Sequence, residues 1–412
     1  MTVSFIFLEG IIIKVSFSPP DISVLEIHEV CEALKSGWIT TGPMTKRFEK
    51  NIAEMIGVNK ACCLNSQTAC AEMALRLLGV GEGDEVITTA YTYTATAAVV
   101  CHVGAKLVLV DTMPNSFEIN YDQVEKAITE KTKVIIPVDL GGVPCNYARL
   151  FQIVDSKKSL FKPKNKIQEA IGRIVISADT AHAFGAKWRN MNVGNIADFS
   201  SFSFHAVKNL TTAEGGALTW RPIDGISDEE IYHQLQLFSL HGQSKDALAK
   251  TQLGAWEYDV VGTWYKCNMT DVAAAIGIKQ LERYPRMLDL RHQIINYYDE
   301  ALHEIGIETL PHYTNEYSSS GHLYITRVPG ISLEERNEII TRMAEQGIAT
   351  NVHYKPLPMH TAYKNLGFDI ADYPNAYEHF KNEITLPLHT CLTGEMENYV
   401  VSNYINIVKD YL

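Results

Sequence analysis

One lysine of this sequence stands in an unusual chemical setting. Lys208 is the only Lys or Arg in the apolar, hydroxyl-rich stretch from Phe199 to Thr212. Burial disfavours the charged ammonium, and the neutral amine is the form that attacks a carbonyl carbon to make a Schiff base. The pattern is compatible with a nucleophilic lysine, but it becomes specific only together with the two features described next. The alternative is an ordinary lysine on a hairpin surface, with its stem packed against apolar neighbours.

An aspartate and a histidine follow an apolar run at 174–178. Asp179 ends that run, and His182 comes three residues later. In open α/β sheets, ligands bind beyond the carboxyl ends of the strands, which is where Asp179 would lie. The alternative is structural: Asp179 caps the following segment, and His182 is a satisfied partner in the core.

A polar run separates a strand-like segment ending at Leu64 from a helix beginning near Ala69. The run contains Ser66, Gln67 and Thr68. A helix N-terminus carries unpaired N–H groups and a positive partial charge, so hydroxyl groups placed there complete an anion site. A plain N-cap is the alternative.

The elements that must position these residues alternate in type. Strand-like runs at 60–64, 85–90, 106–111, 133–138 and 174–178 enclose helical patterns at 68–79 and 95–104. This alternation predicts right-handed crossovers and a largely parallel sheet. A hairpin texture at 199–204 and 215–220 then surrounds Lys208. We expect an N-terminal extension at 1–16, a large domain at 17–275 and a small C-terminal domain at 276–412.

The bulk composition narrows the function classes. The 412 residues carry a formal charge of −12, and no Lys/Arg-rich block could neutralise a row of phosphates. Nucleic acid is therefore not an expected partner. The eight cysteines lack metal-ligand spacing, so we expect no metal site, but buried free thiols in a reducing cytoplasm. No uninterrupted apolar run reaches the roughly 18 residues that span a bilayer, so we expect no membrane association.

Five segments, taken together, resemble the DegT/DnrJ/EryC1/StrS family of sugar aminotransferases. They are GWITTGP, EVITTAYTYTATA, ADTAHAFGA, SFSFHAVKNLTTAEGGAL and WYKCNMTDVAAAIG. The resemblance extends from about Phe17 to the C-terminus. It implies the α/β fold type I of enzymes that depend on pyridoxal 5'-phosphate (PLP). That fold has a large domain with a mostly parallel mixed sheet flanked by helices, and a smaller C-terminal α+β domain.

The resemblance also implies roles for individual residues. Lys208 would bind PLP covalently and later move the proton between substrate and cofactor carbons, and Asp179 would pair with the pyridinium nitrogen. The further cofactor contacts that it implies are Tyr93 stacked on the ring, with Tyr91 as a competing candidate, His182 near the ring hydroxyl, and Ser66, Gln67, Thr68 and Ser203 at the phosphate.

Asn268 resembles a residue that reaches the phosphate from the neighbouring subunit, which implies a homodimer with shared active sites. As an alternative, Asn268 caps the helix that begins near Thr270. The sequence departs from the family pattern at Cys267, where an aromatic residue is common, and in the long segment between Cys145 and Arg173.

The resemblance further implies a substrate class. The pair His205–Ala206 favours amination at C4 of a nucleotide-diphospho-4-keto-6-deoxy sugar, such as the UDP-N-acetyl form used for bacterial surface glycans. Glutamate would be the amino donor, in a ping-pong reaction through pyridoxamine 5'-phosphate. His353, Tyr354 and Lys355 resemble the family's substrate loop, whereas a Pro-rich surface turn is the alternative. Two alternative functions remain open. The protein could aminate C3 of a dTDP-3-keto-6-deoxyhexose, or it could be a non-catalytic regulatory relative of the same fold.

Overall fold

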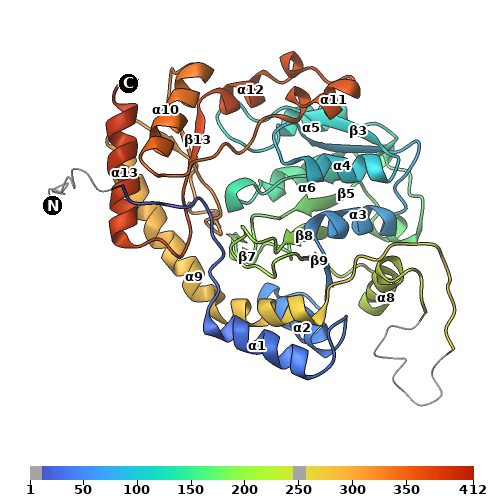
Figure 1. Cartoon of the computed structure of the whole chain (residues 1–412). Coiled ribbons are helices and arrows are strands. Elements are labelled where there is room, and N and C mark those ends of the chain that lie inside the picture. Colours follow the sequence, from blue (N-terminus) through green and yellow to red (C-terminus); the bar gives the residue numbers. More distant parts are fainter. Residues whose placement is uncertain (1–11, 245–256) are drawn as a thin grey trace.

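The computed structural model describes residues 12–244 and 257–412 (Figure 1). Its α-helices in these ranges are α1 (Val24–Lys35), α2 (Pro43–Ile56), α3 (Gln67–Leu77), α4 (Thr94–His102), α5 (Tyr121–Ala127), α6 (Tyr147–Ser156), α7 (Lys166–Ile171), α8 (Asp228–Ser239), α9 (Asp271–His303), α10 (Leu333–Glu345), α11 (Thr361–Asn365), α12 (Pro374–Lys381) and α13 (Gly394–Val408). Its strands are β1 (Ala61–Leu64), β2 (Glu85–Thr89), β3 (Lys106–Val110), β4 (Thr132–Ile136), β5 (Val175–Asp179), β6 (Lys187–Trp188), β7 (Met191–Asn192), β8 (Phe199–Ser203), β9 (Gly216–Trp220), β10 (Glu308–Thr309), β11 (Tyr317–Ser318), β12 (Tyr324–Arg327) and β13 (Glu383–Leu386).

A seven-stranded sheet organises the larger part of the molecule. Its strand order is β1-β9-β8-β5-β4-β2-β3. The pairs β2/β3, β2/β4, β4/β5 and β5/β8 are parallel, whereas β9 is antiparallel to both β8 and β1. The predicted fold class, a mostly parallel mixed sheet flanked by helices, is therefore confirmed, as is the hairpin texture that places Lys208 between β8 and β9.

Both faces of this sheet are covered, which explains the continuous apolar runs in the sequence. Along β1, Cys62 and Leu64 belong to one core cluster, and Ala61 and Cys63 belong to another. Because side chains alternate across a strand, these two clusters lie on opposite faces. The first cluster contains residues of α3, α4 and α8, and the second contains residues of α2, α6 and α9.

A second part of the chain packs around a three-stranded antiparallel sheet in the order β10-β12-β13. Helix α9 runs continuously from α1 and α2 to this second part, where it lies beside α13 (Figure 1). The proposed division between residues 275 and 276 falls within α9 and stays a prediction. Of the proposed extension at 1–16, residues 1–11 lie outside the described residues, and Val15 pairs with Ile348.

Other expectations concern cysteines, metals and membranes. The eight cysteines are free thiols, and four of them (Cys62, Cys63, Cys70 and Cys145) are buried as expected. Cys31, Cys101 and Cys391 are instead exposed. Within 12–244 and 257–412, no group of three or more His, Cys, Asp or Glu side chains could hold a metal ion. No helix in those ranges combines the length and the apolar character needed to cross a bilayer.

Candidate active site

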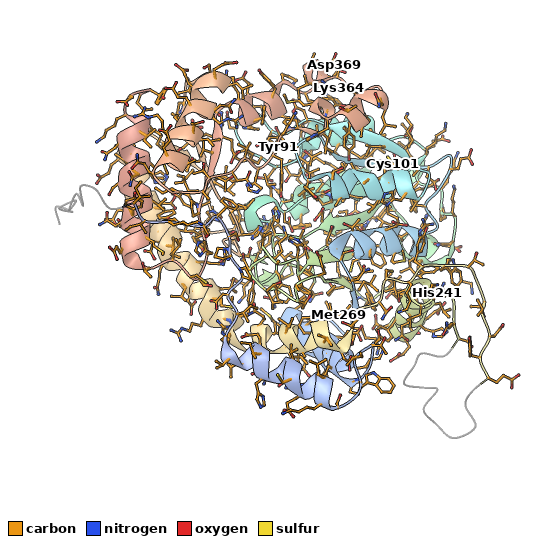
Figure 2. All side chains as sticks on the ribbon, in the orientation of Figure 1. Tyr91, Cys101, His241, Met269, Lys364 and Asp369 are labelled. Carbon is orange, nitrogen blue, oxygen red and sulfur yellow. The ribbon has the colours of Figure 1, made fainter. Side chains whose placement is uncertain are left out.

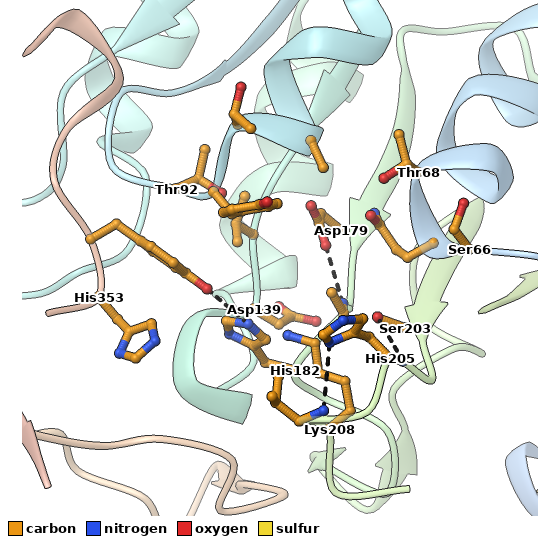
Figure 3. A pocket seen from close by; sticks show the side chains of 18 of the residues that line it. Ser66, Thr68, Thr92, Asp139, Asp179, His182, Ser203, His205, Lys208 and His353 are labelled. Carbon is orange, nitrogen blue, oxygen red and sulfur yellow. Dashed lines mark hydrogen bonds between the residues drawn. The ribbon is translucent and has the colours of Figure 1, made fainter. Parts of the chain in front are cut away.

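A cavity of about 900 Å³ opens beyond the carboxyl ends of the parallel strands (Figure 3). Segments from both parts of the chain line it, including the loop at 351–355. The cavity brings together the following residues singled out from the sequence: Ser66, Gln67, Thr68, Tyr93, Asp179, His182, Ser203, Lys208, His353, Tyr354 and Lys355. Their roles remain predictions, but these residues share one enclosed space.

Asp179 is the last residue of β5 and is buried. Its Oδ2 accepts a hydrogen bond of 2.6 Å from the Thr96 hydroxyl, and its Oδ1 accepts one of 3.1 Å from the backbone N–H of Ala181. Burial raises the pKa of this carboxyl, while the bond from Thr96 acts in the opposite direction. The hydrogen bond from the Ala181 N–H agrees with the alternative that Asp179 caps the following segment. The Asp179 carboxyl nevertheless also lines the cavity.

Lys208 lies on the loop between β8 and β9, and its side chain is partly buried in the cavity. Burial lowers the pKa of this amine to about 8, against the opposing attraction of the Asp179 carboxylate. Near physiological pH, an amine with such a pKa has a larger neutral fraction than an ordinary lysine, and the neutral form is the one that a Schiff-base nucleophile requires. The position does not fit an exposed lysine on a hairpin surface.

The N-terminus of α3 forms one side of the cavity. The helix begins at Gln67, two residues earlier than expected, and Ser66 caps it by accepting from the backbone N–H of Ala69. The N-cap alternative is therefore confirmed for Ser66, whereas the anion site stays a prediction. Gln67 is buried and donates to the Ser201 hydroxyl at 3.0 Å. A Cβ on Gly216 would lie 2.5 Å from the backbone nitrogen of Gln67, so only glycine lets β9 approach this closely.

Two tyrosines near the end of β2 have opposite environments. Tyr93 is 60% exposed and lines the cavity, whereas Tyr91 is fully buried. Figure 2 labels Tyr91 well inside the outline of the molecule and the exposed Lys364 near its upper edge. Tyr91 is absent from the cavity lining. The cavity therefore favours Tyr93 as the stacking residue.

His182 is buried and hydrogen-bonded at both ring nitrogens. The backbone N–H of Gly141 donates to Nδ1 at 3.2 Å, so the ring proton is on Nε2, 3.2 Å from the Tyr354 hydroxyl. Burial and the charge of Lys208 hold the pKa of His182 well below its usual value. His182 is therefore a neutral hydrogen-bond donor beside the cavity.

His322 was not anticipated from the sequence. Its Nε2 lies 3.5 Å from Nζ of Lys208, and its ring centroid lies 4.4 Å from that of His182. Asn209 donates through its amide N–H₂ to the carbonyl of Ser320, so its amide oxygen accepts from Nδ1–H of His322 at 2.9 Å. This leaves the Nε2 lone pair to face Lys208. The local sequence SSSGHLYI gives no periodic signal that would have indicated this contact.

Asn268 does not line the cavity of its own chain. Its side chain donates to the Thr41 hydroxyl at 2.5 Å, and its backbone pairs with Leu64 at the end of β1. The capping alternative is wrong, because α9 begins at Asp271 and Thr270 caps it. The predicted contact of Asn268 with a neighbouring subunit lies outside a single chain.

The comparisons with known proteins cover almost the whole chain. The model of the DegT/DnrJ/EryC1/StrS aminotransferase family matches residues 20–404. Over 400 residues, the chain is 35% identical to the spore coat polysaccharide biosynthesis protein SpsC of Bacillus subtilis, with 95% of this chain and 97% of that protein aligned.

Solved structures agree with this match. The PMP form of Spr1654 from Streptococcus pneumoniae, assigned as a sugar aminotransferase, has a TM-score of 0.94 and 55% identity, and the alignment covers 97% of this chain and 100% of that chain. Helicobacter pylori PseC, an aminotransferase involved in the biosynthesis of pseudoaminic acid, has a TM-score of 0.84 and 26% identity, with 96% and 100% covered.

Proposed function

Because this chain belongs to the DegT/DnrJ/EryC1/StrS aminotransferase family and is thus a sugar aminotransferase, we propose that it aminates C4 of a nucleotide-diphospho-4-keto-6-deoxy sugar with glutamate as the donor. The observation that carries this proposal is the shared cavity of Lys208 and Asp179 beside the N-terminus of α3. An amine that is readily neutral, a buried carboxyl and a helix N-terminus are the three groups that a phosphorylated pyridine aldehyde requires.

The residues present fit PLP, the cofactor of this family. Lys208 would hold it covalently, and Asp179 would keep a proton on the ring nitrogen. The backbone N–H groups of α3, with Ser66 and Ser203, offer donors to the phosphate. When bound, PLP supplies an electron-withdrawing ring that stabilises negative charge at the carbon that loses its proton.

Residues of the chain itself can then transfer the proton and shield the cavity from water. With its pKa near 8, Lys208 can accept the proton from the carbon of the amino donor that loses its amino group. In the second half-reaction, the same amine can deliver a proton to the sugar carbon that receives the amino group. His182, as a neutral Nε2–H donor, can hydrogen-bond an oxygen on the ring. Tyr93 and Tyr354, whose ring centroids lie 6.0 Å apart, both line the cavity, and a ligand held between them and Lys208 would be partly shielded from water.

Two residues of the cavity lining support the proposed substrate class. Lys355 and His360 line the cavity and are exposed, and a lysine suits a diphosphate group. The names of two relatives, a spore coat polysaccharide protein and an enzyme of pseudoaminic acid biosynthesis, support a role in bacterial surface glycan synthesis. We propose UDP-N-acetyl-4-keto-6-deoxyhexose as the first acceptor to examine.

The proposal includes a cytoplasmic homodimer in which Asn268 reaches the partner's cavity. Its support is that Asn268 lies at the end of β1 but outside the cavity of its own chain. An exposed apolar stripe on α1, comprising Val24, Ile27 and Leu34, is also available for burial between subunits.

An absorption experiment tests the proposed function. The purified protein is mixed with PLP, then with glutamate, and then with UDP- or dTDP-linked 4-keto and 3-keto sugars in separate samples. We expect a visible band with PLP, its loss with glutamate and its return with one keto sugar. A protein that never takes up PLP contradicts the proposal, and a band restored only by a 3-keto sugar contradicts the C4 assignment.

A further inference from the structure

Two buried side chains on β13 form hydrogen bonds with His353, one with its backbone and one with its ring. Glu383 and Thr385 are two residues apart in the strand, so they share a face, and both are fully buried. The backbone N–H of His353 donates to Oε2 of Glu383 at 2.9 Å. The Thr385 hydroxyl lies 2.5 Å from Oε1 of Glu383 and 2.9 Å from Nδ1 of His353. A carboxyl, a hydroxyl and an imidazole thus form one chain of hydrogen bonds.

The direction of each bond follows from the number of hydrogens. An ionised carboxylate only accepts, so Thr385 donates its single hydroxyl hydrogen to Glu383. The oxygen of Thr385 can then only accept from His353, which places the imidazole proton on Nδ1. Burial and the nearby charge of Lys208 lower the pKa of His353 to about 3, so the ring carries one N–H and its Nε2 keeps a lone pair.

His353 is placed to use this lone pair. Its ring lines the main cavity (Figure 3) and stacks on Phe17 at a centroid distance of 5.5 Å. Backbone pairing between Asn351 and Thr385 joins the loop to β13. In the described residues, Nε2 of His353 has no hydrogen-bond partner, whereas Nδ1 is occupied by Thr385.

We propose that Glu383 is a positioning residue that acts through Thr385 to hold His353 as the Nδ1–H tautomer, so that Nε2 accepts a hydrogen bond from a substrate hydroxyl group. The contact with a substrate hydroxyl rests on the proposed function, but the tautomer does not.

The surroundings of Glu383 make this arrangement sensitive to pH. The titratable or charged groups that surround it are His353 and Tyr354 of the loop, Arg336 of α10, Arg327 of β12, Tyr404 of α13 and the buried Tyr91. Arg336 donates to the backbone carbonyl of Glu383, not to its carboxylate. Burial raises the pKa of Glu383 to about 7. Below that pH, a protonated Glu383 can donate to Thr385, which can then donate to Nδ1 of His353.

Nitrogen NMR of the apo protein tests the tautomer directly. Long-range ¹H–¹⁵N correlation spectra of histidine-labelled protein distinguish Nδ1–H from Nε2–H rings, and the His353→Gln variant assigns the His353 signals. We expect the Nδ1–H form at about pH 8.5 and a growing Nε2–H population below about pH 7. An Nε2–H ring at pH 8.5 overturns the proposal.

Substitutions distinguish the effect of the hydrogen-bond relay from Glu383 through Thr385 to His353 from an effect of packing alone. In Glu383→Gln, the backbone N–H of His353 retains the amide oxygen, so the amide N–H₂ faces Thr385 and should drive His353 to the Nε2–H form at every pH. Thr385→Ser should keep the wild-type tautomer and its pH response. The matched control is Glu378→Gln, an exposed residue of α12, which should change nothing. A Glu383→Gln protein that keeps the Nδ1–H ring refutes the relay.

The kinetic consequence is tested separately. Loss of the acceptor lone pair should raise the KM for the keto sugar by about three- to tenfold, the usual worth of one neutral hydrogen bond. The KM for glutamate should remain unchanged. If none of the candidate sugars is turned over, the proposed function fails while the NMR result still decides the tautomer. An unchanged KM for an active keto sugar contradicts the substrate contact.

Discussion

Nζ of Lys208 lies 3.5 Å from Nε2 of His322, across 114 residues of sequence. The amide oxygen of Asn209 accepts a hydrogen bond from Nδ1–H of His322, so the lone pair of the ring is on Nε2 and faces the amine. A hydrogen bond of this kind stabilises the charged form of lysine more than the neutral form. His322 therefore opposes the burial that lowers the pKa of Lys208.

Replacing His322 by Leu should lower the pKa of Lys208 further, by about one unit, because a hydrogen bond to a charged group is worth about 1.5 kcal/mol. The measurement is the pH dependence of Lys208 acylation in the apo protein, followed by mass spectrometry of the peptide. The exposed Lys35 in the same digest is the internal control. A reactivity midpoint that stays near pH 8 shows that His322 does not affect the amine.

Replacing Lys208 by Ala should abolish the visible band with PLP and reduce turnover by about a hundred- to ten-thousandfold, the range for a lost proton-transfer group. The melting temperature should change little, since Lys208 forms no salt bridge within residues 12–244 and 257–412 and loses only the 3.5 Å contact with His322. Lys208→Arg, which keeps a cation but no nucleophile, is the control and should also be inactive. Turnover equal to that of the wild type in either variant would contradict the proposed catalytic role of Lys208.

Asp179→Asn should still bind PLP but lose most activity, since a neutral amide cannot keep a proton on the ring nitrogen. A variant close to wild type would instead support the structural capping of Ala181. Thr96→Val offers a graded test, because it removes the 2.6 Å bond that favours the charged carboxylate. The pKa of Asp179 should then rise, and the acid limb of the kcat/KM profile should move to higher pH. A limb that moves to lower pH would contradict this reasoning.

Gly216→Ala should destabilise the protein by about 1–3 kcal/mol, because the new Cβ would overlap the backbone at Ser66 and Gln67. The PLP dissociation constant should rise with it, since α3 supplies the phosphate site. Gly394→Ala, where a Cβ meets no atom within 4 Å, is the control and should be neutral or slightly stabilising. Denaturant unfolding and PLP titration of both variants provide the comparison.

Mixing two inactive variants tests the shared active site. If Asn268 serves the partner's cavity, a dimer of one Lys208→Ala chain and one Asn268→Ala chain contains one complete site. After random exchange of equal amounts, activity should recover to about a quarter of wild type, because half the dimers carry one good site of two. Recovery should be absent if Asn268 acts within its own chain. Gel filtration with light scattering checks that each variant is a dimer, and mixing one tagged variant with one untagged variant, followed by capture on the tag, provides the control for subunit exchange.

The local features of this protein could be read from its sequence because they depend on neighbouring residues. The alternation of strand-like and helical segments indicated the parallel sheet, the end of one apolar run located Asp179, and the hairpin texture located Lys208. Capping residues located the start of α3 to within two residues. All of these are consequences of strand and helix periodicity.

Only the tertiary structure decided which distant side chains meet. His322 reaches Lys208, Thr96 reaches Asp179, and Glu383 reaches His353 because separate elements pack together, and no periodicity encodes those pairings. Packing likewise favours Tyr93 over Tyr91 as the stacking residue, since both follow the same strand and only Tyr93 lines the cavity. Sequence patterns therefore indicated the fold class and the two central residues, whereas long-range packing determined the burial that shifts their pKa values and the hydrogen bonds that oppose it.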